Sequence, residues 1–138
     1  MKRRDFLAAS AAVALVPAFA QASTGWIEYT PGLVKKRLAQ GETVFIDYSA
    51  EWCTTCKSQE RTIGALMSEN PAYAQAVTFI KIDWDKYGRG ELAQELNIPR
   101  RSTLVVLKGD QELGRIVAGT RRADIQALMD TALNAATA

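Results

Sequence analysis

Histidine is absent from all 138 residues of this chain, and cysteine occurs only twice. A structural zinc site takes four nitrogen or sulfur ligands. One copy of the chain therefore lacks the histidines and cysteines for such a site, whereas two copies that each give both cysteines would have enough. The chain also lacks internal repeats and long linkers, and its length fits a single domain.

The N-terminus has no apolar run long enough for a membrane-spanning helix, because the run at residues 7–16 is too short. Basic residues at 2–4 precede this run and small residues at 18–22 follow it, which predicts a signal peptide over residues 1–22. The pattern at residues 3–7 resembles the twin-arginine export signal; an ordinary secretory signal is the alternative. Either route predicts a periplasmic protein, in a compartment that permits disulfides.

The mature domain, residues 23–138, has no excess of either charge. Removal of residues 1–22 takes away three of the 17 basic residues and one of the 15 acidic residues, which leaves 14 of each. Charge therefore gives no argument for nucleic-acid binding. A domain of this size buries a real core, so it does not need a disulfide to fold, and its two cysteines are free for chemistry.

Both cysteines lie in one short motif, Cys53-Thr54-Thr55-Cys56, between a predicted buried strand and a predicted helix. This arrangement indicates a redox-active pair. Unpaired amides and the helix dipole stabilise a thiolate at a helix N-terminus, so we expect Cys53 to be exposed and acidic. Cys56 lies about one turn later, where it can close a disulfide, and we expect it to be buried and nearly inert. Half of a metal site and an inert structural pair are the alternatives.

Alternating element types run along the rest of the chain. We expect strands over residues 26–29, 43–49, 77–83, 103–107 and 113–118. Five helices are expected between and after them. The first runs from Pro31 to Gly41, with Thr30 as its N-cap, and the second follows the cysteine motif. The other three are expected from Asn70 to about Ala76, around residues 92–97, and over residues 125–133. This order predicts an α/β fold with a central mixed sheet of about five strands and helices on both faces.

Residues 47–57, Asp-Tyr-Ser-Ala-Glu-Trp-Cys-Thr-Thr-Cys-Lys, are similar to the active-site signature of the thioredoxin family. Residues 103–110 resemble the strand and turn that follow the family's substrate loop, and residues 117–119 resemble its late glycine turn. The resemblance covers about residues 26–133 and implies a thioredoxin-like fold. Within the family, the segment after the motif looks most like the C-terminal domain of the transmembrane reductant conductor DsbD.

The resemblance implies a role for each residue of the motif. Cys53 would attack a client disulfide and Cys56 would resolve the mixed disulfide. Asp47 matches the family's buried acid; a satisfied strand carboxylate is the alternative. Because an acid inside an apolar strand loses solvation of its charged form, we expect a raised pKa for Asp47. Trp52 would shield the disulfide or simply pack, and Lys57 would either aid the thiolate or, as we favour, be solvated.

One position departs from the family pattern. The family usually has a cis-proline just before the strand that begins here at Thr103, and this chain has Ser102. A cis bond before a non-proline residue costs about 2.5–4 kcal/mol, so we expect a trans Arg101–Ser102 bond and a reshaped loop. The family pairs this loop with an extended client peptide, which implies substrate binding by Arg101, Ser102 and Thr103. Arg100 and Arg101 would place positive charge near Cys53, unless they point into solvent.

The sequence thus predicts a periplasmic thiol–disulfide oxidoreductase that reduces client proteins through Cys53 and Cys56, without a cofactor or metal. The pair Thr54-Thr55 lacks the histidine of the family's strong oxidants, which favours a reductant supplied with electrons by a membrane partner. The alternative is a module that binds or delivers metal, because loss of the proline in thioredoxins implies an open route for metal. A peroxidase is disfavoured by the two-residue cysteine spacing.

Overall fold

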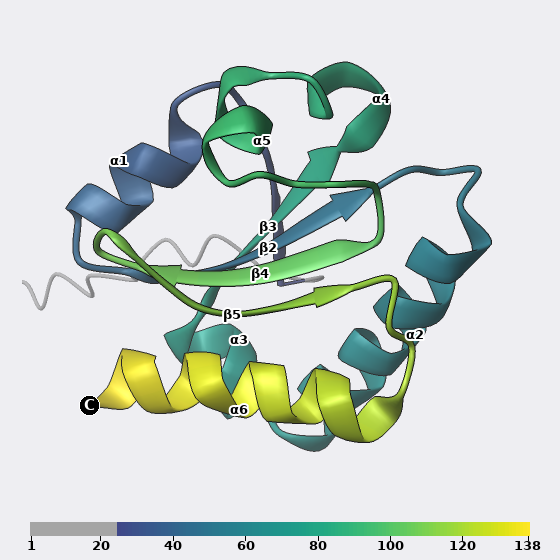
Figure 1. Cartoon of the computed structure of the whole chain (residues 1–138). Coiled ribbons are helices and arrows are strands. Elements are labelled where there is room, and N and C mark those ends of the chain that lie inside the picture. Colours follow the sequence, from purple (N-terminus) through teal and green to yellow (C-terminus); the bar gives the residue numbers. More distant parts are fainter. Residues whose placement is uncertain (1–24) are drawn as a thin grey trace, which may run out of the picture.

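A computed structural model describes residues 25–138 as one five-stranded mixed sheet covered by helices (Figure 1). The sheet order is β1-β3-β2-β4-β5, in which β3 is parallel to both β1 and β2 whereas β4 is antiparallel to both β2 and β5. The elements are β1 (Trp26–Glu28), α1 (Leu33–Ala39), β2 (Thr43–Ser49), α2 (Thr54–Glu69), α3 (Ala72–Ala76), β3 (Thr78–Asp83), α4 (Trp84–Tyr87), α5 (Glu91–Glu95), β4 (Thr103–Lys108), β5 (Gln111–Val117) and α6 (Arg122–Thr137).

The two faces of the sheet carry separate apolar clusters. Helices α2, α3 and α6 cover one face, and α1 and α5 cover the other (Figure 1). All seven residues of β2 are buried, as expected for a central strand. Phe45 packs in the α2–α6 cluster and Tyr48 in the α1–α5 cluster. Since side chains alternate along a strand, Asp47 and Ser49 point to the same face as Phe45, beneath α2.

Helix α2 presents one buried stripe to the sheet, made of Cys56, Gln59, Ile63 and Leu66. This spacing of three and four residues is the helical period, and it brings Cys56 into the face that covers Asp47. The helix ends at Glu69. The backbone amide of Ala72 then donates to Oδ1 of the Asn70 side chain at 3.2 Å, and α3 follows where the sequence predicted a helix, although its N-cap is Pro71 and not the predicted Asn70.

The main differences from the sequence-based expectation concern α1, α4 and β5. Thr30 is not the N-cap of α1, because its carbonyl accepts a turn hydrogen bond from the amide of Leu33 at 3.0 Å and the helix begins only at Leu33, after Gly32 in the left-handed region. Helix α4 was not predicted, since four residues are too few to show a helical period. Strand β5 begins at Gln111, two residues earlier than expected.

Candidate active site

The cysteine pair forms a disulfide at the N-terminus of α2, with the two Cα atoms 5.3 Å apart. Cys53 is the N-cap residue: its backbone is extended, and its Sγ accepts a hydrogen bond from the backbone amide of Cys56 at 3.1 Å. The sulfur therefore occupies the place where a helix favours negative charge. Our expectation of an exposed Cys53 is wrong for this oxidised state, because its residue surface is 3% exposed and that of Cys56 is 0%.

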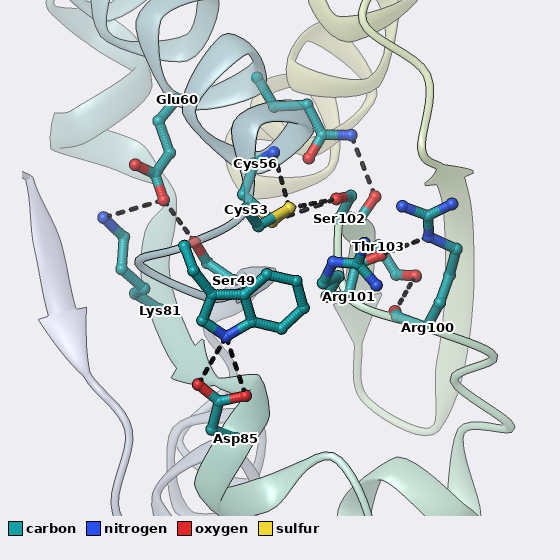
Figure 2. Close-up of a disulfide and its surroundings, with 12 residues drawn as sticks. Ser49, Cys53, Cys56, Glu60, Lys81, Asp85, Arg100, Arg101, Ser102 and Thr103 are labelled. Carbon is teal, nitrogen blue, oxygen red and sulfur yellow. Dashed lines mark hydrogen bonds and ion pairs between the residues drawn. A yellow bond between two sulfur atoms is a disulfide. The ribbon is translucent and has the colours of Figure 1, made fainter.

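Ser102 covers the disulfide from the loop before β4 (Figure 2). Its Oγ lies 3.1 Å from Sγ of Cys53 and 3.1 Å from Sγ of Cys56. The residue is fully buried, has a left-handed backbone with φ of 62°, and is joined to Arg101 by a trans peptide bond, as predicted. The loop is thus fixed against the sulfurs by a serine with an unusual backbone conformation.

The backbone groups of Ser102 are already bonded inside the protein. Its amide donates to the carbonyl of Tyr48 at 2.7 Å, and its carbonyl accepts from the amide of Ala118 at 2.9 Å. The carbonyl also accepts from Nε2 of Gln59 at 3.0 Å. Thr103, the next residue, is buried and pairs on both sides in the sheet, with Tyr48 and with Val117. These two residues therefore hold the loop in place.

Arg101 belongs to the outer rim of the site. Its guanidinium lies over the ring of Trp52, with Cζ 4.4 Å from the ring centroid, while its carbonyl accepts from Nε of Arg100 at 3.0 Å. Nε of Arg101 is buried and has no hydrogen-bond partner in the described chain. Both arginines are partly buried, so neither is a freely solvated side chain.

Trp52 lies beside the disulfide with its ring partly exposed to solvent. Its side chain is anchored at one edge, because Nε1 donates to the two carboxylate oxygens of Asp85 in α4 at 2.9 and 3.2 Å. The residue is nevertheless 58% exposed, so a partner protein can still contact its ring. Lys57 is exposed, which agrees with the solvated role we favoured for it.

Asp47 is fully buried beneath α2, and neither oxygen of its carboxylate has a hydrogen-bond partner in the described residues. Burial raises the pKa of Asp47 from 3.8 to about 8; the nearby Glu60 carboxylate adds to this effect and the Lys81 ammonium opposes it. The direction confirms the prediction. A carboxyl group with a pKa close to neutral can both accept and return a proton at physiological pH.

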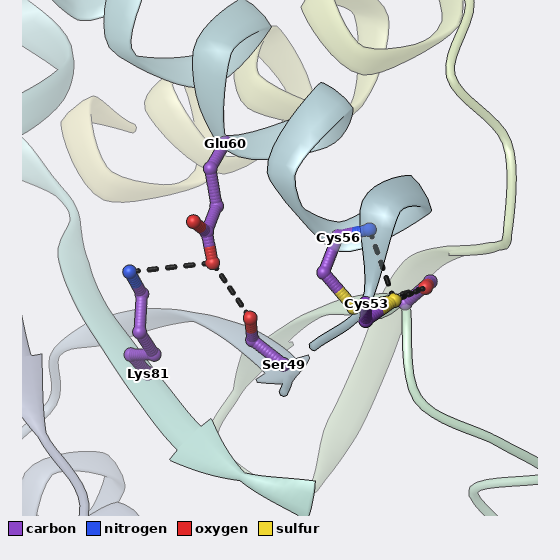
Figure 3. Close-up of polar contacts among 6 residues, drawn as sticks. Ser49, Cys53, Cys56, Glu60 and Lys81 are labelled. Atoms are coloured by element: carbon purple, nitrogen blue, oxygen red, sulfur yellow. Dashed lines mark hydrogen bonds and ion pairs between the residues drawn. A yellow bond between two sulfur atoms is a disulfide. The ribbon is translucent and has the colours of Figure 1, made fainter. Parts of the chain in front are cut away.

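A polar cluster of Ser49, Glu60 and Lys81 lies on one side of the disulfide (Figure 3). Oγ of Ser49 donates to Oε1 of Glu60 at 2.6 Å, and Nζ of Lys81 lies 3.3 Å from the same oxygen. Lys81 is also the strand neighbour of Asp47 in the β2–β3 register. All three cluster residues line a groove of about 720 Å³. Figure 2 places this cluster on the opposite side of the disulfide from Arg100 and Arg101.

Sequence reasoning missed three residues that shape this site: Gln59, Glu60 and Asp85. Gln59 is fully buried and donates to the carbonyls of Ser102 and Gly119 at 3.0 and 2.9 Å. Its signal was present, because a polar residue three positions after Cys56 falls on the buried face of the helix and needs partners there. The contacts of Glu60 and Asp85 carried no such signal, since they join segments far apart in the chain.

Within residues 25–138, no group of three or more histidine, cysteine, aspartate or glutamate side chains is placed to hold a metal ion. In the same part of the chain, no helix combines the length and apolar character that crossing a membrane requires. The predicted signal peptide, residues 1–22, lies outside the described residues.

Comparisons with known proteins agree with the geometry. The family model described as Thioredoxin matches residues 27–131. Thioredoxin H2-1 of Oryza sativa subsp. japonica is 33% identical over 78 residues, which are 56% of this chain and 52% of that protein, so the chain spans about half of that relative. The H-type thioredoxin of Brassica oleracea is 28% identical over 118 residues, 86% of this chain and 90% of that protein. The crystal structure of Trxlp from Edwardsiella tarda superposes with a TM-score of 0.64 at 27% identity, over 75% of this chain and 97% of that one.

Proposed function

Because the chain belongs to the thioredoxin family and is a thiol–disulfide oxidoreductase, we propose that it works outside the cytoplasm, in the periplasm, as a reductant of disulfides in client proteins. One observation carries the assignment of roles within the pair. Sγ of Cys53 caps α2 and accepts the amide of Cys56, whereas Cys56 lies inside the first turn. Cys53 is therefore the sulfur whose negative charge the helix stabilises.

The reduced protein begins the reaction with Cys53 as a thiolate and Cys56 as a thiol. The thiolate attacks one sulfur of the client disulfide, which forms a mixed disulfide with Cys53 and releases the other client sulfur as a thiolate that takes a proton from water. Cys56 then loses its proton and attacks Sγ of Cys53. The mixed disulfide breaks and the second client sulfur leaves as a thiolate, which takes up the proton that Cys56 gave away. Two electrons have then passed from the cysteine pair to the client.

Asp47 is the acid that we assign to the resolving step. It lies in β2 on the face that α2 covers, which is also the face to which Cys56 contributes. Its pKa of about 8 lets the carboxylate take the proton of Cys56 as that thiol becomes a nucleophile. The cluster of Ser49, Glu60 and Lys81 lines the groove, and its Glu60 and Lys81 act on Asp47 through their charges, since one raises and the other lowers its pKa.

Client proteins would dock on the rim formed by Trp52 and Arg101. The backbone of Ser102 is fully bonded and Thr103 is paired inside the sheet, so Arg101 is the one of the three predicted substrate residues that remains available to a client. Its guanidinium, held over the exposed ring of Trp52, favours clients that carry acidic residues beside their disulfide.

Export and electron supply complete the proposal. The basic, apolar and small-residue order of residues 1–22 supports export, with a twin-arginine signal as the favoured route. A reductant in an oxidising compartment needs a source of electrons, for which a membrane donor is the simplest arrangement. The likeness of the segment after the motif to the C-terminal domain of DsbD supports such a donor.

Trapping of mixed disulfides tests the function directly. A Cys56→Ser variant lacks the resolving thiol, so it should accumulate client proteins attached through Cys53, whereas Cys53→Ser should trap none. Equal recovery with both variants, or none with either in periplasmic extracts, would count against the proposal. The metal content of the purified protein tests the alternative of a metal-binding module, which requires a stoichiometric ion bound to both cysteines.

A further inference from the structure

The hydroxyl of Ser102 contacts both sulfurs of the active site. It lies 3.1 Å from Sγ of Cys53 and 3.1 Å from Sγ of Cys56 (Figure 2). In the oxidised state neither sulfur carries a proton, so the hydroxyl is the donor in these contacts, and its single proton is directed at one sulfur at a time or shared between the two. Cys53 has a second donor, the amide of Cys56, but Cys56 Sγ has no other hydrogen-bond partner in the described chain.

The position of this hydroxyl is fixed by the fold. Ser102 is fully buried, and its amide and carbonyl are bonded to Tyr48, Ala118 and Gln59. These elements, β2, α2 and the turn after β5, enclose the residue from three directions. The left-handed backbone, which a non-glycine residue seldom adopts, is therefore imposed by its surroundings, and it aims Oγ at the disulfide.

We propose that Ser102 is a catalytic residue that donates one hydrogen bond to whichever active-site sulfur carries negative charge. In the reduced protein the hydroxyl donates to the Cys53 thiolate. After attack, the charge leaves with the client, and Cys56 becomes the thiolate once its proton has passed to Asp47. The same hydroxyl then donates to Cys56 while that sulfur displaces the client from Cys53. The hydroxyl keeps its proton throughout: the bonds exchanged are sulfur–sulfur bonds, and the one S–H bond that breaks is that of Cys56, whose proton forms an O–H bond on Asp47.

This assignment rests on the oxidoreductase function and adds a residue to it. A proline at this position would have neither an amide proton nor a hydroxyl, whereas Ser102 uses both, one to fix the loop and one to reach the sulfurs. A hydrogen bond to a charged group contributes enough to change an ionisation equilibrium by about tenfold or more. Stabilising a thiolate also favours the reduced form of the pair, so Ser102 raises the reduction potential.

Two substitutions distinguish the effect of losing the hydroxyl from the effect of straining the backbone. Ser102→Ala and Ser102→Gly both remove the hydroxyl, but glycine adopts a positive φ without strain. Ser68→Ala, at an exposed position near the end of α2, is the matched control. The first measurement is the pH dependence of Cys53 alkylation in the reduced protein, and the second is the reduction potential against glutathione. Neither measurement needs a client protein.

We expect both Ser102 variants to lose about tenfold in the rate of Cys53 alkylation at mildly acidic pH, since less thiolate is present. The reduction potential should fall by about 30 mV for each tenfold change. In a Cys53→Ala background, Ser102→Gly should also move the ultraviolet titration of the Cys56 thiolate to higher pH. The control Ser68→Ala should match the unsubstituted protein in the alkylation and potential measurements.

Two results would overturn the assignment. One is an unchanged alkylation profile and potential in both Ser102 variants. The other is a change in Ser102→Ala that Ser102→Gly does not share, because that difference would come from backbone strain and not from the hydroxyl. Circular dichroism establishes that the variants are folded. Failure of the proposed function would look different, since the Cys56→Ser protein would then trap no client proteins while the Ser102 measurements stayed as expected.

Discussion

Replacement of Asp47 by asparagine should change how the stability of this protein depends on pH. Asparagine has nearly the same shape as aspartate but does not ionise. In the folded protein the pKa of Asp47 is about 8, against 3.8 for the free side chain, chiefly because its carboxyl group is buried without a hydrogen-bond partner. Folding therefore favours the protonated acid, and Asp47 weakens the fold wherever the unfolded chain would ionise it.

The size of the effect follows from the two pKa values. Below pH 3.8 both states are protonated and Asp47 costs nothing; between the two values the free energy of unfolding falls by about 1.4 kcal/mol per pH unit. Above pH 8 the loss levels off. Relative to Asp47→Asn, the unsubstituted protein should lose roughly 2.5 kcal/mol between pH 5 and pH 7. This is a large share of the 5–15 kcal/mol that is typical of a whole domain.

Urea unfolding of the oxidised protein at several pH values measures this difference. The asparagine variant loses a pH-independent amount of stability, because its side-chain amide is buried without a hydrogen-bond partner. The measurement therefore compares how steeply the free energy of unfolding changes with pH, and not its absolute value. Glu51→Gln, at an exposed position beside the motif, serves as the control and should run parallel to the unsubstituted protein. Parallel curves for Asp47→Asn as well would refute the burial argument, and a normal rate of disulfide exchange in that variant would remove Asp47 from the mechanism.

Three further predictions concern other parts of the chain. Mass spectrometry of periplasmic material should find a protein that begins after residue 20 or 22, and an intact Met1 would exclude the predicted signal peptide. Alkylation of the reduced protein at mildly acidic pH should label Cys53 before Cys56, whose sulfur lies inside the first turn of α2; equal labelling would contradict the assignment of roles. Arg101→Ala removes the guanidinium over Trp52 and should weaken the salt dependence of exchange with clients that have acidic residues beside the disulfide; an unchanged salt dependence would show that Arg101 does not contact them.

Local patterns were sufficient to predict most of the fold. The nearly continuous apolar run at residues 44–48, interrupted only by Asp47, predicted the fully buried strand β2, and Asn70-Pro71 predicted the start of α3 to within one residue. Both are determined by near neighbours in the chain. Thr30 misled the prediction because threonine and a following proline are typical of a helix start, whereas in the structure Thr30 closes a turn that ends in the left-handed Gly32.

The active site likewise contains residues that the sequence predicted and contacts that it could not predict. The two cysteines, Asp47 and the trans bond before Ser102 follow from local chemistry: a motif, a charge inside an apolar strand, and the cost of a cis bond without proline. The hydrogen bonds of Gln59 to Ser102 and Gly119 could not be predicted. They join residues 43 and 60 positions apart, so they exist only once the sheet and α2 have been assembled.

The cysteines that carry the chemistry enclose a very short stretch of chain, because Cys53 caps α2 and Cys56 lies in its first turn. In the chain-entropy model a crosslink stabilises a protein by restricting its unfolded state, and closing a four-residue loop contributes roughly 2 kcal/mol against about 4.7 kcal/mol for a hundred-residue loop. Opening and closing this disulfide therefore changes the free energy of unfolding by less than half of the change that a hundred-residue crosslink would cause. The short loop limits how far each cycle of oxidation and reduction alters the stability of the sheet and helices.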